Sequence, residues 1–393
     1  MNTVLKPGRI GSLTLRNRII KTATYEGMTP GGLVGDRLVA FHRSMAKNQV
    51  GLTTVAYGAV SPQGRTFEEQ LLVGPENAAG LKRIADAVHG EGGAVSLQLA
   101  HCGGFSRNAS IEGGRALGPS KGWNKYGLLV GVPRIREMDE QDLERVIADF
   151  ARAARIAQDA GIDAVEIHCG HGYLLSQFLS PIINRRRDEW GGDLDKRGRL
   201  AVAVVDAVRQ AVGRDFPILA KVNTADGVPG GLELNESISV ARSLVAAGVD
   251  CLIPSGGLVT HSPWYLMRGD VPLKSMLRVE HHWAQRWALR CFGPFVMKHY
   301  SYAPNFFLAD AQEMADAVSV PVALLGGVDS AAAIDQAVDA GFEWVVMGRA
   351  LLADPDFIPR LASGEAIVSR CTHCNECVAE MDRDGLRCVL DSG

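Results

Sequence analysis

The chain has 393 residues, enough for two ordinary domains or for one large α/β barrel with additions. Hydrophobic residues make up 47% and charged residues 22%, the balance of a globular protein with a large core, and a net charge of -3 argues against a nucleic-acid partner. The sequence has neither the apolar run of about 18 residues that a membrane span needs nor the apolar centre of a signal peptide. We therefore expect a cytoplasmic protein with no membrane partner.

Eight short apolar segments are predicted strands. In chain order they are residues 17–25, 50–58, 93–101, 159–168, 215–223, 246–255, 319–327 and 339–348. Amphipathic stretches separate most of them and predict helices at 76–90, 138–160, 195–213, 235–247, 308–318 and 330–340. Three of the strand segments contain Ala-Gly near their start, which is typical of a helix that ends and releases the chain into a strand buried on both faces.

These alternating elements predict a closed (β/α)8 TIM barrel over residues 1–362, with an open doubly wound sheet as the alternative. The interval 256–307 shows no clear repeat, and we interpret it as an insertion between units six and seven that forms part of a pocket wall. Residues 363–393 form a short C-terminal tail that carries four cysteines.

Nearly every predicted strand ends in a polar side chain or a glycine. These ends are Thr22 to Tyr25, Tyr57, Gln98 and His101, His168 and His171, Lys221 and Asn223, Ser255 and Gly256, Gly326 and Gly327, and Gly348 and Arg349. In a barrel, the C-terminal ends of the strands form the active site. The pattern therefore predicts a ring of functional groups at one end of the barrel.

His168, His171 and Tyr173 lie within six residues of one another, directly after a predicted strand. Three interpretations compete: metal ligands, packed core residues, or hydrogen-bonding groups that face a pocket. A zinc site requires a further ligand, and a core position suits one histidine better than two beside a tyrosine. The pocket is the favoured interpretation.

Two further sites follow from residue type. Gly326-Gly327 and Gly348-Arg349 end the last two strands, where barrels commonly bind phosphate. Lys221 on a buried strand needs an anionic partner, either a ligand or an acidic side chain elsewhere in the barrel.

The cysteines of the tail lie close together in the sequence, as Cys371, Cys374, Cys377 and Cys388. In a cytosolic protein such spacing indicates zinc or an iron–sulfur cluster, with free thiols as the alternative.

Five stretches together resemble the Old Yellow Enzyme family of NADH:flavin oxidoreductases. They are "LRNRIIKTAT", "VSPQGR", "SLQLAHCGG", "EIHCGHGYLLSQFLSPIINRRRDEWGGDLDKRGRL" and "VVMGRALLADPDF", within a match that runs from about residue 5 to 390. The tail is similar to the branch that contains 2,4-dienoyl-CoA reductase and trimethylamine dehydrogenase.

This resemblance implies FMN on the barrel. The cofactor contacts that it implies are Ala23, Thr24, Tyr25, Tyr57, Gln98, His168, Lys221, Ser255, Gly256, Gly326, Gly327, Gly348 and Arg349. Lys221 is expected at the N1/C2 edge of the flavin, and Gln98 at its pyrimidine edge. Tyr25 departs from relatives that have a cysteine or a threonine there, so their flavin potentials do not transfer to this chain.

The resemblance also implies an ene-reductase that uses NAD(P)H to reduce an activated C=C bond, and we expect a homo-oligomer. His168 and His171 would bind the carbonyl oxygen of the substrate, and Tyr173 would protonate its α carbon. One alternative is a flavin-dependent amine dehydrogenase or demethylase, which a carbonyl-binding pair suits less well. A flavin-free barrel that acts as a binding protein is an alternative of another class.

For the tail, the resemblance implies a [4Fe–4S] cluster on Cys371, Cys374, Cys377 and Cys388, although the last interval is shorter than in relatives. Zinc or no metal are the alternatives. In those relatives the cluster passes electrons to a second flavin domain. Because the sequence ends at Gly393, we expect that domain to be absent and an external electron donor to replace it.

Overall fold

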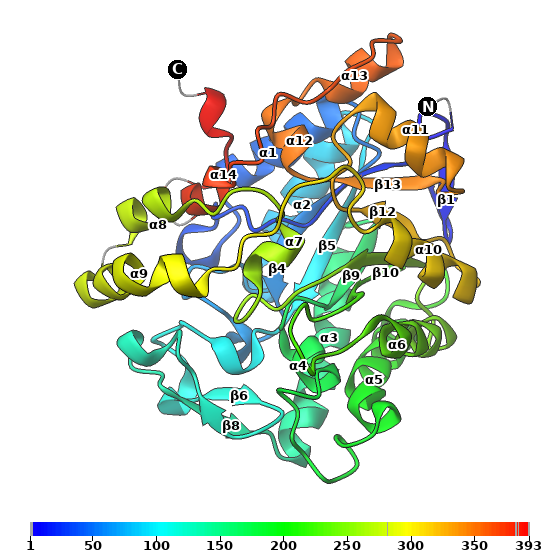
Figure 1. Cartoon of the computed structure of the whole chain (residues 1–393). Helices are drawn as coiled ribbons and strands as arrows, with labels where there is room; N and C mark the ends of the chain where they lie inside the picture. Colours follow the sequence, from blue (N-terminus) through cyan, green and yellow to red (C-terminus); the bar gives the residue numbers. More distant parts are fainter. Residues whose placement is uncertain (1–2, 281, 382, 384, 392–393) are drawn as a thin grey trace.

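The computed structural model describes residues 3–391 apart from 281, 382 and 384, and its centre is an eight-stranded parallel sheet (Figure 1). The strands are β3 (Ile19–Lys21), β4 (Leu52–Ala59), β5 (Ala94–Ala100), β9 (Ala164–Cys169), β10 (Ile218–Asn223), β11 (Cys251–Ser255), β12 (Ala323–Leu325) and β13 (Trp344–Met347). Each of the eight predicted segments overlaps one of them, and β4 and β9 end one residue beyond the predicted segment. They lie in the order β11-β10-β9-β5-β4-β3-β13-β12.

Leu252 of β11 closes this sheet. Its amide donates a 3.0 Å hydrogen bond to the carbonyl of Pro321, just before β12, and Leu252 forms a parallel bridge with Val322. The sheet is therefore a closed barrel, which confirms the predicted (β/α)8 fold over the open sheet.

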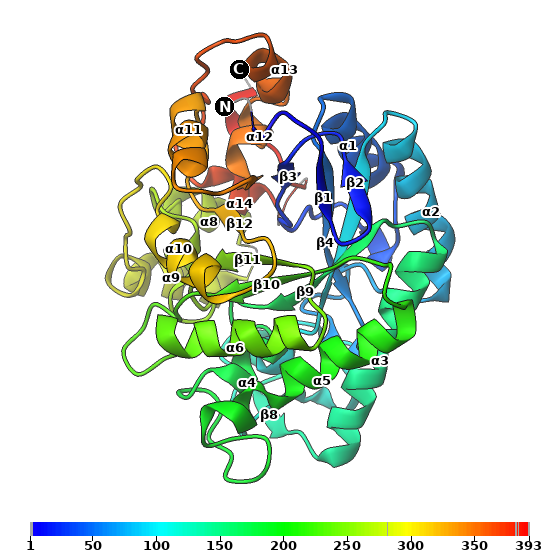
Figure 2. The same cartoon turned by 90° about the vertical axis from the view of Figure 1, so that its right-hand side faces the viewer.

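Helices cover the outside of the barrel (Figure 2). They are α1 (Asp36–Lys47), α2 (Pro75–His89), α3 (Glu140–Asp159), α5 (Leu194–Val212), α6 (Leu234–Ala246), α10 (Leu308–Ala317), α11 (Ala331–Asp339) and α12 (Arg349–Ala353). The six predicted helices are all present, whereas α1 and α12 were not predicted. Gly161, Gly248 and Gly341 of the Ala-Gly signals have φ angles of 85°, 114° and 93°, a backbone that glycine adopts without strain.

The remaining elements lie outside the eight barrel strands and the helices that cover them. They are β1 (Gly8–Ile10), β2 (Leu13–Leu15), β6 (Ala116–Gly118), β7 (Gly122–Trp123), β8 (Arg134–Glu137), α4 (Leu174–Leu179), α7 (Pro263–Leu266), α8 (Leu273–Val279), α9 (Trp283–Val296), α13 (Phe357–Ala362), α14 (Glu376–Glu380), and the 3-10 helices η1 (Pro30–Gly32), η2 (Pro62–Gly64), η3 (Gly103–Phe105), η4 (Glu112–Gly114), η5 (Leu128–Val130) and η6 (Val389–Asp391). The predicted insertion contains α7, α8 and α9, and the predicted tail contains α14 and η6. The domain boundaries themselves stay predictions.

The barrel interior is filled at the end where the strands begin. Ile10 and Leu15 of the β1–β2 hairpin pack there with Ile20, Leu52 and Trp344 in an apolar cluster. A filled lower half leaves the opposite end, where the strands finish, as the place for a pocket.

The connection from β5 to α3 holds the unpredicted sheet of β6, β8 and β7. Its strands have only two to four residues, too few for a readable alternation of polar and apolar positions.

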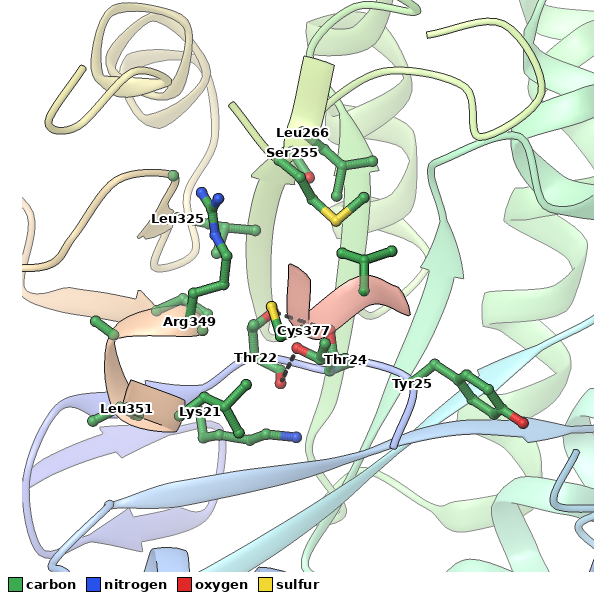
Figure 3. Close-up of a pocket in the computed structure, with 18 of the residues that line it drawn as sticks. Lys21, Thr22, Thr24, Tyr25, Ser255, Leu266, Leu325, Arg349, Leu351 and Cys377 are labelled. Carbon is green, nitrogen blue, oxygen red and sulfur yellow. Dashed lines mark hydrogen bonds between the residues drawn. The ribbon is translucent and has the colours of Figure 1, made fainter. Parts of the chain in front are cut away.

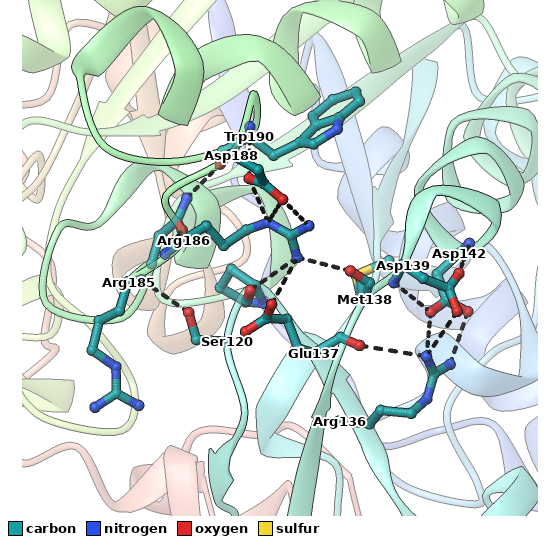
Figure 4. A network of polar contacts seen from close by, with 12 residues as sticks. Ser120, Arg136, Glu137, Met138, Asp139, Asp142, Arg185, Arg186, Asp188 and Trp190 are labelled. Atoms are coloured by element: carbon teal, nitrogen blue, oxygen red, sulfur yellow. Dashed lines mark hydrogen bonds and ion pairs between the residues drawn. The ribbon is translucent and has the colours of Figure 1, made fainter.

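Beside this sheet, the Arg186 guanidinium bonds the Asp188 carboxylate at 2.6 Å and the carbonyls of Pro119 and Met138 (Figure 4). These bonds hold the loop around Arg186 in its conformation.

No helix among the described residues is long and apolar enough to cross a membrane.

Candidate active site

A pocket lies at the C-terminal ends of the barrel strands, and Figure 3 shows part of its lining. All eight strands contribute side chains to it. The predicted site residues that line it are Ala23, Thr24, Tyr25, Tyr57, Gln98, His168, His171, Tyr173, Lys221, Ser255, Gly326, Gly327, Gly348, Arg349, Cys371 and Cys377. The predicted insertion contributes Val259, Leu266, Met267, Tyr302 and Phe306 to the wall. Residues that are far apart in the sequence therefore meet in one place, as the strand-end pattern predicts.

Gly256 is the exception among the predicted cofactor contacts. It does not line the pocket but packs against Tyr265, whose Cε1 atom would lie 2.6 Å from a Cβ at this position. A side chain at this position would meet the Tyr265 ring, so the glycine permits this packing, and the expected contact of Gly256 with a cofactor stays a prediction.

Lys221 at the end of β10 is 1% exposed and finds its anionic partner inside the barrel. Its Nζ atom lies 2.9 Å from Oε1 of Glu166 and 3.0 Å from Oγ1 of Thr22. Gln98 donates a 2.5 Å hydrogen bond to the same Glu166 oxygen. An acidic side chain, one of the two partners expected for Lys221, is therefore present. This residue, Glu166, was not predicted as a site residue, and it orients both Lys221 and Gln98 toward the pocket.

We expect Glu166→Ala to lower the free energy of unfolding by about 3–5 kcal/mol, because it leaves the Lys221 ammonium buried without its partner. Chemical denaturation measures the change. The control is Asp86→Ala, which removes an exposed partner of Lys82 and should cost less than about 1 kcal/mol. Equal losses in the two variants would contradict the importance of the buried pair.

A second buried ion pair lies beside the pocket. Lys21, which lines the pocket, places its Nζ atom 2.9 Å from Glu26, and Nε2 of His42 lies 3.4 Å from the same carboxylate. Burial lowers the pKa of Lys21 and of His42. Burial would raise the pKa of Glu26, but Lys21 and His42 hold it below its ordinary value. These contacts were not predicted, since they join β3, its following loop and α1.

His168 and His171 both line the pocket and pack edge to face, with ring centroids 4.9 Å apart. Burial lowers the pKa of His168 well below its ordinary value, and His171 and Lys221 lower it further. Burial and Lys221 lower the pKa of His171 to about 3. Both imidazoles are therefore neutral near pH 7. His171 has φ of 60°, and Asn223 holds this turn by accepting its amide hydrogen bond at 2.9 Å.

The buried neutral state of His171 makes stability depend on pH. The unfolded chain takes up this proton near pH 6.5, whereas the folded chain resists it until about pH 3. The folded state is therefore fully stabilised above pH 6.5 and loses this contribution as the pH falls toward 3. We expect His171→Asn to flatten the decline of unfolding free energy between these values, measured by urea titration. Exposed His282→Asn is the control, and parallel profiles for His171→Asn and the parent would contradict the assignment.

Tyr173 follows the histidines and is 7% exposed. Its ring lies 4.4 Å from that of His168 and 5.0 Å from that of Tyr57, measured between centroids. Burial raises the pKa of Tyr173, while side-chain hydrogen bonding with Tyr57 lowers it in part. The Tyr57 hydroxyl in turn donates to Oγ1 of Thr66 at 3.3 Å. The hydroxyl groups of Tyr173, Tyr57 and Thr66 thus form a line of polar groups that begins at the pocket wall.

Arg349 lies at the other end of the pocket, beside Gly348. Its Nη1 atom donates to the carbonyl of Arg268 at 3.0 Å and to the side chain of Asn375. Asn375 is 1% exposed and donates to the carbonyls of Met267 and Asp270 at 2.7 and 2.9 Å. The cysteine-bearing tail therefore holds Arg349 against the pocket wall, a role for Asn375 that was not predicted.

The four tail cysteines line one small cavity together with Arg349 and Asn375. Cys371 and Cys377 line the main pocket as well, so the two spaces adjoin. Among the described residues, no group of three or more His, Cys, Asp or Glu side chains is placed to share one metal ion. Burial raises the pKa of Cys377 to about 12.

The chain belongs to the NADH:flavin oxidoreductase / NADH oxidase family, whose sequence profile matches residues 3–261. This confirms the resemblance to the Old Yellow Enzyme family and sets aside the flavin-free binding protein.

Curated relatives differ in length. The chain is 39% identical over 391 residues to 4,4'-dithiodibutanoate disulfide reductase of Rhodococcus erythropolis, covering 99% of this chain and 95% of that protein. It is 34% identical over 380 residues to a metal reductase of Desulforamulus reducens, covering 96% of this chain but 51% of that protein. It is 34% identical over 282 residues to an NADPH dehydrogenase of Listeria welshimeri, covering 71% and 80%. The chain thus spans about half the length of some relatives.

Solved structures show the same fold. The old yellow enzyme homologue from Zymomonas mobilis superposes with a TM-score of 0.72 at 20% identity and covers 94% of this chain and 95% of that one. A 2-naphthoyl-CoA reductase gives a TM-score of 0.79 at 22% identity, over 97% of this chain and 58% of that one.

Proposed function

We propose that the chain holds FMN in this pocket and reduces an activated C=C bond of an α,β-unsaturated carbonyl compound, with NAD(P)H as electron donor. When bound, FMN supplies the hydride for this reduction. The observation that carries the proposal is that two neutral imidazoles and a phenol, His168, His171 and Tyr173, line one pocket. The coarser assignment, a flavin oxidoreductase, rests on the family itself.

The residues of the pocket fit FMN. Gln98 and Lys221 offer an amide and an ammonium to the polar edge of a flavin, and both are held by Glu166. At the other end, Gly326 and Gly327 have φ angles of 109° and 84°, and Arg349 supplies a guanidinium for a phosphate. Polar groups thus stand at both ends of the pocket, as a flavin mononucleotide requires.

The imidazoles would act as hydrogen-bond donors to the carbonyl oxygen of the substrate. Nδ1 of His168 accepts the amide hydrogen of Gly170 at 3.4 Å, so the proton of the neutral ring is on Nε2. Nε2 of His171 lies 2.7 Å from Oγ of Ser255. If Ser255 donates this bond, the proton of His171 is on Nδ1. Two neutral N–H groups then stabilise the negative charge that develops on the oxygen during reduction.

Phenol titration tests this carbonyl-binding role, because a phenolate oxygen binds at the same position and its charge-transfer band with the flavin reports occupancy. We expect His168→Ala and His171→Ala to weaken phenol binding by at least about tenfold. Ser255→Ala should weaken it by a smaller factor, and His89→Asn, a change far from the pocket, should leave it unaltered. An unchanged band in both pocket variants would refute the role.

Reduction of the C=C bond also needs one proton. We propose that the Tyr173 hydroxyl gives it to the α carbon, and that the Tyr57 hydroxyl then turns its one proton from Thr66 to the resulting phenolate. The line from Tyr173 through Tyr57 to Thr66 supports this role, since a buried phenolate is costly without a donor.

Disulfide reduction is the second candidate function. It is favoured by the 39% identity to the disulfide reductase of Rhodococcus erythropolis over nearly the whole of both chains. In this reaction two electrons from NAD(P)H and two protons convert one disulfide into two thiols, and Tyr173 is placed to protonate a departing thiolate. Incubation with NAD(P)H and 4,4'-dithiodibutanoate, with thiol release measured, tests it. Faster thiol release than enone reduction would make this the main function.

For the tail, we propose a [4Fe–4S] cluster on Cys371, Cys374, Cys377 and Cys388. A cluster distributes its thiolates over several iron atoms and needs a wider arrangement than zinc, and the four thiols line one cavity without converging on one ion. The adjoining main pocket would let electrons from an external donor reach the flavin. Iron and sulfide analysis of anaerobically prepared protein tests this. One zinc per chain, or neither metal, would refute it.

A further inference from the structure

Helix α9 exposes four large aromatic side chains. Trp283, Trp287, Phe292 and Phe295 are 79%, 59%, 54% and 87% exposed. Together with α8, this helix projects from the side of the barrel (Figure 1). We name these four residues the α9 patch. Aromatic side chains of this size are normally buried, so a grouping on one helix indicates a surface that meets an apolar partner.

The α9 patch lies away from the contact between α8 and α9. Gly293 is buried, and a Cβ there would lie 2.9 Å from Cδ1 of Leu273 on α8. That side of α9 therefore rests on α8. At 3.6 residues per turn, Trp283 and Trp287 share another side, and the Trp287 and Phe292 rings have centroids 6.0 Å apart. The rings of Trp287 and Phe292 thus adjoin, and all four aromatic side chains of the helix are exposed.

The same region is basic although the chain as a whole is acidic. Residues 271–300 contain five Lys and Arg and one Glu, a charge of +4, so the remainder of the chain carries -7 against the total of -3. The five cations are exposed: Lys274, Arg278, Arg286, Arg290 and Lys298. Positive charge is therefore concentrated around the aromatic rings.

We propose that the α9 patch docks on the surface of an anionic lipid bilayer. Trp and Phe side chains enter the boundary between headgroups and acyl chains, and neighbouring arginines meet lipid phosphates. The acidic remainder of the chain is repelled, which orients the protein with α9 toward the lipid. A helix of 14 residues is too short to span a bilayer. The expectation of no membrane partner rested on the lack of a spanning segment, and a helix that lies on the surface needs none.

A second copy of the chain is the competing occupant, and charge disfavours it. Pairing two α9 helices about a two-fold axis would place Arg286 and Arg290 of both copies in one interface without acidic partners on α9. Anionic lipid instead satisfies both the apolar and the cationic part of the surface.

Docking would also bring the pocket wall close to the lipid. Met267 and Tyr302, which flank the α8–α9 segment in sequence, both line the pocket. Tyr300 pairs with Gly269 in an antiparallel bridge, so the two ends of the segment meet beside the pocket. A substrate dissolved in the bilayer surface would then have a short path to the site.

Vesicle co-sedimentation of the flavin-loaded chain tests the proposal. We expect binding to vesicles of phosphatidylcholine with 30 mol% phosphatidylglycerol, at least about tenfold weaker binding to phosphatidylcholine alone, and release by 0.5 M NaCl. Trp287→Ser with Phe295→Ser, and separately Arg286→Glu with Arg290→Glu, should each weaken binding at least about tenfold. Trp123→Ser, which changes another exposed tryptophan, is the matched control and should bind as the parent does.

Two results would overturn the proposal. One is equal sedimentation with and without the anionic lipid. The other is a dimer in solution, seen by sedimentation velocity, that Trp287→Ser with Phe295→Ser dissociates while vesicle binding stays absent in both forms. Unchanged NAD(P)H oxidation in every variant would show that each one is folded and loaded.

Discussion

Replacing Arg349 with alanine is expected to weaken FMN binding by at least about a hundredfold while riboflavin binding stays unchanged. A guanidinium bonded to a phosphate makes charge-assisted hydrogen bonds, and their combined loss corresponds to about 3 kcal/mol. Riboflavin lacks the phosphate and therefore serves as the internal control. Fluorescence quenching during titration of the apoprotein measures both constants.

Asn375→Ala should change FMN affinity in the same direction by about tenfold, again without affecting riboflavin. The side chain of Asn375 bonds Arg349 and the carbonyls of Met267 and Asp270, so its loss frees the guanidinium. The double variant should bind FMN no more weakly than Arg349→Ala alone. Asn124→Ala, which removes a buried asparagine that bonds the carbonyls of Ser106 and Val132, is the matched control.

If Arg349→Ala bound FMN like the parent, the phosphate site proposed at the ends of β12 and β13 would be wrong. If Arg349→Ala lost FMN while Asn375→Ala did not, the proposed phosphate site would be supported. The proposed role of the tail in holding Arg349 would be wrong.

The second large effect is expected for Tyr173→Phe. This variant should reduce an enone about 10²–10⁴-fold more slowly, because the α carbon loses its proton donor, while reduction of the flavin by NAD(P)H proceeds at the parent rate. Stopped-flow absorbance separates the two half-reactions. Tyr57→Phe should slow only the enone step, and by a smaller factor, since it removes a donor to the phenolate and leaves Tyr173 in place.

Normal rates in both half-reactions of Tyr173→Phe would mean that another group protonates the substrate. A slow flavin reduction in Tyr173→Phe would instead place the tyrosine in the binding of NAD(P)H.

The barrel and its ring of strand-end residues could be predicted because both depend on local patterns. Ala-Gly signals mark three of the helix ends, and nearly every strand ends in a polar side chain or a glycine. In a parallel barrel those positions meet, so His168, Lys221 and Arg349 could be placed in one pocket without knowledge of any contact between them.

Contacts between specific side chains could not be predicted in this way. Which acid meets Lys221 depends on the register of β9 against β10, where Lys221 stands beside His168. The position of Asn375 depends on how the tail returns to the barrel. Gly256 has the same residue type as the pocket glycines, and its close approach to Tyr265 is visible only in the folded chain.

The exposure of α9 could not be predicted either. Its alternation of aromatic and basic residues is equally compatible with a buried helix, because the aromatic rings would then face the core. The structure shows that α8 lies against the side with Gly293, whereas the four aromatic side chains of the α9 patch are exposed.

Anaerobic stopped-flow oxidation of the reduced flavin is the most direct test of whether the pocket reduces an enone. The flavin of the loaded chain is reduced with one equivalent of NAD(P)H and mixed with 2-cyclohexenone. We expect the flavin absorbance to return in a single turnover with formation of one equivalent of cyclohexanone, and we expect His168→Ala with His171→Ala to slow this step by at least about a hundredfold. A reduced flavin that stays reduced with the enone, but is promptly oxidised by 4,4'-dithiodibutanoate, would contradict this expectation.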